Sequence, residues 1–158
     1  MAGLVATPNI SQAEAAITIA SDGWFPAVSL AQVREDLVLD GTITTTRLRR
    51  AIRHGIAQVN NELRAWKDEQ VQATGAANLA AVPSETIDGE HVKSGFYFRA
   101  VCGYVEADLF EKHRGYDLTA EGQRRAEMLD ARIGEARRNA FWALQDIRGL
   151  PHTVSGLV

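Results

Sequence analysis

The segment from Ile87 to Val158 is the most informative part of the sequence: IDGEHVKSGFYFRAVCGYVEADLFEKHRGYDLTAEGQRRAEMLDARIGEARRNAFWALQDIRGLPHTVSGLV. It holds two long stretches in which apolar residues recur every three or four positions, the spacing of a helix. Asp88 can cap the first helix, which should run to about His113, and Thr119 can cap the second. Gly149 and Pro151 are typical helix-ending signals, and the chain beyond them has no helical period. We therefore expect two long helices and an apolar, non-helical tail.

The first of these helices is apolar over more than one face. Its aromatic and aliphatic residues include Phe96, Tyr97, Phe98, Ala100, Tyr104, Ala107, Leu109 and Phe110. A helix that is apolar nearly all round is central to a core or lies at an interface, where it could supply a contact between copies of the chain.

Three of the predicted long helices carry an interior glycine, at Gly55, Gly103 and Gly134. Each costs about 1 kcal/mol relative to alanine. Two explanations remain open for these positions: a close approach between helices, or tolerated local bending.

Residues 1–28 read as an N-terminal arm rich in small residues, in which the stretch 15–19 alternates weakly and could pair as a short strand. Trp24 and Phe25 stand beside a proline. Aromatic side chains of this size are unfavourable in water, so they should anchor the arm either on the body of the chain or on a neighbour.

The remaining helices precede Ile87. Ser29 and Gln32 have the spacing of a capping box and predict a short helix that Gly41 ends. A long helix should begin after the threonines at 44–46 and fade near Gln70, followed by a loop over residues 73–86. The expected fold class is all-α: an antiparallel bundle of about four helices over residues 29–149, with the arm 1–28 and an extended tail over residues 150–158.

The composition is that of an ordinary soluble domain. The chain has 158 residues, of which 46% are hydrophobic and 23% charged, so we expect one domain with arms. The formal net charge of −3 disfavours a free-standing binder of duplex DNA. The N-terminus lacks the pattern of a secretory signal and no apolar run approaches the length of a membrane helix, so we expect no membrane partner and a cytosolic product.

The sequence carries no signature of catalysis or of a bound cofactor. The four histidines are scattered without metal-ligand spacing, and no nucleophile elbow, Walker loop or dinucleotide fingerprint is present. Cys102, the single cysteine, lies in the apolar helix and should be a buried structural thiol. We therefore expect a protein that is not an enzyme and that needs no cofactor or metal.

A basic strip, Arg47, Arg49, Arg50 and Arg53, lies at the start of the long helix that follows the threonines. It could meet DNA phosphates or acidic groups on another protein, and it could also be a solvated helix face. The arginines of the last helix are interleaved with acidic residues, which is typical of a solvated face with ion pairs such as Glu121 to Arg125.

The tail holds the residues that we predict to contact a partner. They are Leu150, Pro151, His152, Thr153, Val154, Leu157 and Val158, and we add Trp24 and Phe25 from the arm. The tail either folds back on the last helix or extends and pairs with a partner through its backbone.

Several motifs in a fixed order resemble the head completion protein (GPL) family of contractile-tailed bacteriophages. The resemblance begins at the aromatic pair and proline of residues 24–26 and is densest after Val82. The other matching residues are Leu48, Arg49, Ala51, Ile52, Gly55, Asn60, Glu62, Leu63, Val82, Pro83, Ile87, Asp88, Gly89, Glu90, the runs 99–102 and 110–117, and Trp142, Ala143, Ile147, Gly149 and Pro151.

This resemblance implies a structural role without chemistry. It implies a head-to-tail adaptor of the phage neck that forms a ring, usually of twelve copies, beneath the portal after DNA packaging. The implied partners are the portal protein, the next neck, stopper or tail-terminator protein, other copies of the chain, and the packaged DNA that passes through the channel. The implied location is the virion, after assembly in the host cytoplasm. The alternative from the residues alone is a helical DNA-binding or packaging-regulatory protein that uses the basic strip.

Overall fold

The computed structural model describes residues 12–112 and 120–152. These residues form mainly helices, with four very short strands. In chain order the elements are α1 (Gln12–Ala15), β1 (Thr18–Ile19), β2 (Val28–Ser29), α2 (Leu30–Asp36), α3 (Thr45–Glu62), α4 (Arg64–Thr74), η1 (Leu79–Ala81), β3 (Thr86–Ile87), β4 (Glu90–His91), α5 (Val92–Lys112) and α6 (Ala120–Arg148).

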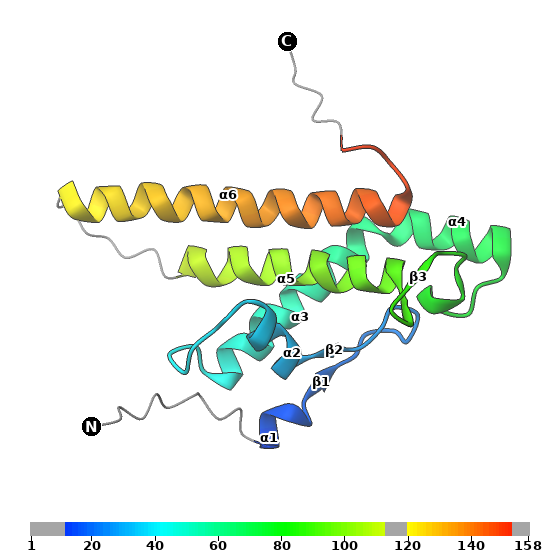
Figure 1. Ribbon diagram of the computed structural model, residues 1–158, viewed down its shortest axis with the longest axis horizontal. Helices are drawn as coiled ribbons and strands as arrows, with labels where there is room; N and C mark the ends of the chain where they lie inside the picture. The colour runs from blue at the N-terminus through cyan, green and yellow to red at the C-terminus, as the bar shows by residue number, and fades with distance from the viewer. Residues whose placement is uncertain (1–11, 113–119, 153–158) are drawn as a thin grey trace, which may run out of the picture.

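The predicted helical architecture is confirmed in part. Figure 1 shows α5 and α6 side by side and antiparallel, with α3 running obliquely across α5. The expectation of an all-α bundle of about four helices misses two small antiparallel sheets, in which β1 pairs with β2 and β3 pairs with β4. Thr18 lies opposite Ser29 in the first sheet, so the weak alternation near residue 19 does form a strand, although a shorter one than the pattern suggests.

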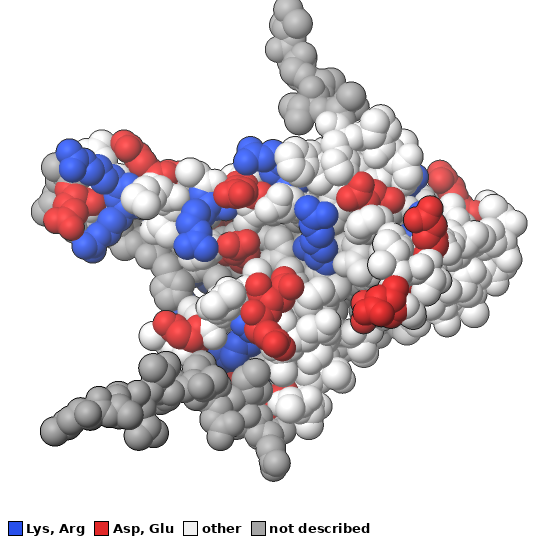
Figure 2. Space-filling model, in the orientation of Figure 1, with Lys and Arg blue, Asp and Glu red and all other residues white. Residues whose placement is uncertain are grey.

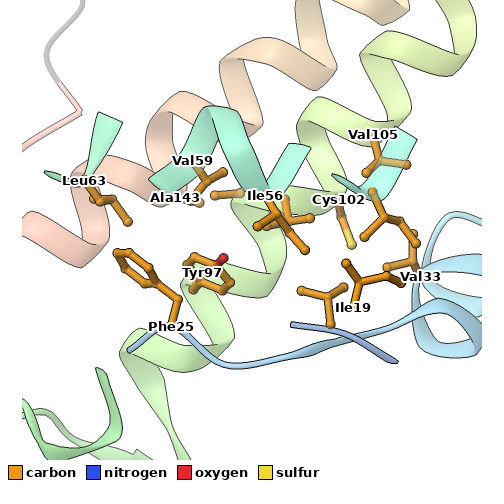
Figure 3. Packing of buried hydrophobic residues seen from close by; sticks show 14 of the residues in the cluster. Ile19, Phe25, Val33, Ile56, Val59, Leu63, Tyr97, Cys102, Val105 and Ala143 are labelled. Carbon is orange, nitrogen blue, oxygen red and sulfur yellow. The ribbon is translucent and has the colours of Figure 1, made fainter. Parts of the chain in front are cut away.

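Helix α5 is the centre of the core. Its side chains Tyr97, Val101 and Val105 are fully buried, and they pack with Ile52 and Val59 of α3. Figure 3 shows this packing from close by, with Tyr97 and Val105 of α5 near Ile56 and Val59. Of the two roles expected for this helix, the structure shows the core position, which leaves little of α5 for contacts between copies.

Glycines allow the three helices to approach closely at two of the three expected positions. A Cβ atom at Gly103 would lie 2.8 Å from both the Ala136 carbonyl oxygen and the Ala140 Cβ on α6. A Cβ at Gly55 of α3 would lie 3.1 Å from the Val101 carbonyl oxygen. Gly134 faces open space, with no heavy atom within 4 Å of such a Cβ. Of the two explanations, close approach between helices therefore applies to Gly55 and Gly103, and tolerated local bending applies to Gly134.

The expected start of α5 at Asp88 is wrong, because Asp88 and Gly89 form a hairpin turn. Both residues have positive φ angles, 51° and 78°, and they connect β3 to β4. Asp-Gly is the favoured pair for a two-residue turn of this type, because both positions require a left-handed backbone. The helix begins only after this turn, at Val92.

The expected continuous helix from the threonines to Gln70 is divided at Leu63. The backbone of Leu63 has a φ of −90° and a ψ of 0°, and its side chain is fully buried. The guanidinium of Arg148 donates a hydrogen bond to the Glu62 carbonyl, which in a continuous helix would accept from the amide four residues later. The chain therefore turns at Leu63, and α4 leaves the core with no buried residue of its own.

The first described residues are fastened to α2 and α3 by a polar cluster. The carboxylate of Glu14 accepts two hydrogen bonds from Arg34, each 3.0 Å long, and a third from the Thr45 hydroxyl. Arg34 also donates to the carbonyl oxygens of Asp40 and Ile43 at 3.0 Å. Only 9% of each of Glu14 and Arg34 is exposed, so this cluster fixes α1 firmly against the body.

Substitution of Gly103 by alanine should destabilise the fold, because the added methyl group meets backbone and side chain of α6. We expect the free energy of unfolding to fall by about 1–3 kcal/mol. Gly134→Ala is the matched control in the next helix, and it should raise the free energy by up to about 1 kcal/mol through helix propensity alone. Urea unfolding followed by circular dichroism measures both, and equal effects would contradict the close approach.

Substitution of Glu14 by glutamine should lower stability in a pH-dependent way. The Thr45 hydrogen bond, with further help from Arg34, holds the pKa of Glu14 below its ordinary value of 4.5. Its stabilisation is therefore fully present above that value and is lost as the pH falls through the lower pKa of the folded state. We expect Glu14→Gln to cost about 2 kcal/mol at pH 7, as measured by urea unfolding, and the difference from the natural chain to shrink below about pH 4.5. A cost that is constant over this range would contradict the assignment.

Candidate partner-binding surfaces

The tail leaves α6 through a sharp left-handed turn at Gly149. The φ angle of Gly149 is 70°, its amide bonds to the Asp146 carbonyl at 3.2 Å, and the Leu150 amide bonds to the Gln145 carbonyl at 2.9 Å. These two bonds define a Schellman motif, in which glycine is preferred because it tolerates a positive φ. The motif ends the helix and reverses the chain, so the tail begins beside α6 (Figure 1).

His152 lies against the last turns of α6. Its ring stacks on Trp142 with centroids 5.4 Å apart and an angle of 8° between the planes, and its Nε2 lies 2.6 Å from the Asp146 carboxylate. Leu150 is 50% exposed, and Pro151 and His152 are exposed as well. Residues 150–152 thus follow the fold-back alternative. Thr153, Val154, Leu157 and Val158 lie outside the described residues.

Two buried polar atoms close to the tail have no hydrogen bond among the residues that the structure describes. They are Nε1 of Trp142, a donor, and Oε1 of Gln145, an acceptor. The two residues are three positions apart on α6, so they are neighbours on the helix surface. A donor beside an acceptor can match the carbonyl and amide groups of an extended segment. The sequence alone does not predict that these two atoms lack a hydrogen bond, because the indole of a Trp and the amide of a Gln usually have partners when they are buried.

The aromatic pair of the arm is buried in the chain's own core. Trp24 is 6% and Phe25 4% exposed. The Trp24 indole donates to the Ala76 carbonyl at 3.0 Å, and Phe25 stacks on Tyr97 with centroids 4.9 Å apart. Of the two expected anchors, the structure shows the body of the same chain, because the core offers these rings both apolar neighbours and a hydrogen-bond acceptor. Little surface of either ring is left for a partner.

The basic strip is exposed and has no acidic partner. Arg47, Arg49, Arg50 and Arg53 are all exposed on α3, and no carboxylate among the described residues lies within 4.0 Å of them. Arg47 sits in the first turn of α3, which contains no acidic residue. The positive end of a helix dipole disfavours cations, so the strip does not stabilise its own helix.

Three arginines of α6 differ from this strip because each of them has an acidic partner. Arg125 lies 3.1 Å from Glu121, as expected, Arg132 lies 3.5 Å from Glu106 of α5, and Arg137 pairs with Glu111. Figure 2 shows Lys and Arg interspersed with Asp and Glu on the face where α6 lies. The prediction of a solvated face with ion pairs is confirmed for Glu121 and Arg125.

Cys102 is buried, as expected, with 3% of its surface exposed. Burial raises the pKa of the Cys102 thiol far above its ordinary value, which keeps it in the unreactive protonated form. In the two described ranges, no three metal-ligating side chains come together and no helix is long and apolar enough to cross a membrane.

Comparisons with known proteins give a consistent picture. The family model described as phage head completion protein (GPL) matches residues 19–158. A curated relative, the head completion/stabilization protein of Escherichia phage P2, is 39% identical over 131 residues, which cover 83% of this chain and 77% of the relative. No solved structure matches the chain.

Proposed function

The chain belongs to the phage head completion protein (GPL) family, and from this membership we propose that it is a structural protein of the phage neck. In this proposal it assembles as a ring beneath the portal after DNA packaging, extends the DNA channel and joins the head to downstream neck and tail proteins. The observation that carries the proposal is the family match over residues 19–158, together with the printed name of the phage P2 relative. The protein is then a component of the virion that is assembled in the host cytoplasm.

The outline of the molecule supports a ring. In Figure 1, α4 and the first turns of α6 extend beyond the body at opposite ends of the long axis. A head-to-tail contact joins two different surfaces of each copy, and repeated contacts of this kind close into a ring when the rotation allows. We propose that these two projections supply the lateral contacts between copies of the chain. Helix α5 does not supply them, because it lies in the core of each copy. A dodecamer is the ring size that we propose.

The C-terminal tail is the proposed portal contact. Leu150 and Pro151 are exposed, and the apolar residues Val154, Leu157 and Val158 follow them. An extended segment can add to a partner surface through its backbone, with alternate side chains in pockets. Twelve such tails would bind far more tightly than one, because each docked copy raises the effective concentration of the next. The opposite face of the ring would meet the next neck, stopper or tail-terminator protein.

Deletion of residues 151–158 tests the tail. The truncated chain should keep its fold, because Pro151 and His152 are exposed and the core ends before them, but it should be missing from virions purified from a phage that encodes it. A matched control replaces Val154, Leu157 and Val158 with serine at constant length and should be nearly as defective. Mass spectrometry of the particles measures incorporation, and normal amounts of the truncated chain would contradict the tail assignment.

A second function is favoured by the unpaired arginines of α3. Four exposed cations within seven residues, with no acidic neighbour in the described part of the chain, are suited to a polyanion. In this alternative the chain binds duplex DNA directly and regulates packaging, with Arg47, Arg49, Arg50 and Arg53 on the phosphates. An acidic surface of another neck protein is the competing partner for the same strip.

The salt dependence of binding distinguishes these partners of the strip. If the four arginines meet phosphates, the logarithm of the DNA affinity should fall with the logarithm of salt concentration with a slope near −3.6, about −0.9 per contact. Replacement of all four by glutamine should abolish the binding, whereas replacement of Arg124, Arg125, Arg137 and Arg138 on α6 removes the same charge and should leave most of it. Fluorescence anisotropy with a labelled duplex from 20 mM salt upward measures the DNA affinity. The absence of binding at 20 mM salt would contradict direct DNA binding.

A further inference from the structure

An apolar groove lies between the α2–α3 connection, the end of α5 and the middle of α6. Its volume is about 340 Å³. Apolar side chains dominate its walls, among them Leu37, Leu39, Leu109, Phe110 and Leu129. On α5 and α6 its charged residues are Glu106 and Arg132, which form an ion pair with 3.5 Å between the guanidinium and the carboxylate. The groove therefore suits an uncharged, apolar occupant.

Val38, at the edge of this groove, is both strained and exposed. Its φ angle is 50°, although a β-branched residue rarely adopts a positive φ. The Leu39 amide bonds to the Arg34 carbonyl at 2.9 Å and the Val38 amide to the Glu35 carbonyl at 3.1 Å, so Val38 holds the position of a Schellman motif that glycine prefers. With 89% of its surface exposed, Val38 receives little packing in return. An unrelieved strain of this kind suggests that the side chain has a contact to make.

The polar cluster at α1 brings the N-terminal segment to this groove. One guanidinium, that of Arg34, bonds both to the carboxylate of Glu14 and to the carbonyl of Asp40, and Asp40 lines the groove. Residues 1–11 directly precede α1, so their point of attachment lies beside the same connection. Eleven extended residues span at most about 36 Å, which is ample to reach and follow the groove.

The composition of residues 1–11 matches the groove. The segment reads MAGLVATPNIS and includes Leu4, Val5 and Ile10, with no charged side chain. The tail is the other apolar segment, but it starts after Arg148, about 24 Å along α6 from Arg132 of the groove, whereas residues 1–11 are attached at the α1 side.

We propose that residues 1–11 dock in this groove of the same chain, with Leu4 or Val5 against Val38. The segment then covers the apolar walls of the groove and gives Val38 its contact. This proposal does not depend on the role of the chain in the phage neck.

Paired cysteines test the docking and its intramolecular character. Leu4→Cys together with Val38→Cys should form an internal disulfide under mild oxidation at micromolar concentration, at least about tenfold faster than Leu4→Cys with Val71→Cys. Val71 is a suitable control because it lies 39% exposed on α4, away from the groove, and the native Cys102 is buried. Non-reducing electrophoresis and mass spectrometry of the linked peptides report the product. Control-level linkage would overturn the proposal, and so would a covalent dimer, which indicates the segment of a second copy.

A thermal measurement provides an independent test. Val38→Gly relieves the strained backbone, so in a full-length chain that also carries Leu4→Ser and Val5→Ser it should raise the melting temperature by about 3 °C. In the natural chain the same substitution also removes the contact with the segment, so the rise should be distinctly smaller. The same rise in both backgrounds would overturn the proposal, even if the cysteine variants fold poorly.

Discussion

Helix α5 can lie at the centre of this molecule only because small residues stand where its neighbours cross it. Gly103 faces Ala136 and Ala140 of α6, and Gly55 of α3 faces Val101, with no space for a larger side chain at Gly103. Protein interiors are packed as densely as organic crystals, so a shift of one of these helices would be felt by both others. The antiparallel pair, the oblique α3 and the fully buried Tyr97 all depend on these two close contacts.

The sequence was sufficient to predict the long helices, because their apolar period and their caps are local signals. Ser29 caps α2 as expected, and Thr44, the first of the three threonines expected to precede the long helix, caps α3. Each accepts a hydrogen bond of 3.3 Å from the amide three residues later. The turn at Asp88 and Gly89 was also open to prediction, since Asp-Gly favours a hairpin as much as Asp favours a helix cap. The division at Leu63 was not, because it depends on Arg148, which lies 86 residues away from Glu62 in the sequence.

The surfaces were harder to predict than the fold, for a physical reason. The sequence of an aromatic pair does not show whether the pair is exposed or buried. Trp24 and Phe25 belong to the core because the Ala76 carbonyl accepts from the indole and the Tyr97 ring stacks on Phe25. The strip on α3 was visible in the sequence, but its lack of acidic partners depends on how the helices pack. The groove beside Val38 had no local signal, since it combines three distant parts of the chain.

The three surfaces that we propose for contacts lie apart from one another on the molecule. The tail leaves one end of α6, the groove lies against the middle of that helix, and the arginines of the basic strip, which have no acidic partner among the described residues, stand on α3. This separation is what a protein needs if it is to meet several neighbours at once, as we propose for a head-to-tail adaptor. Electron cryo-microscopy of the head-to-tail joint of intact virions is the decisive measurement for this proposal. We expect a closed ring of this chain directly beneath the portal, with each C-terminal tail against the portal protein. A joint that contains no copy of the chain, or copies without contact to the portal, would contradict it.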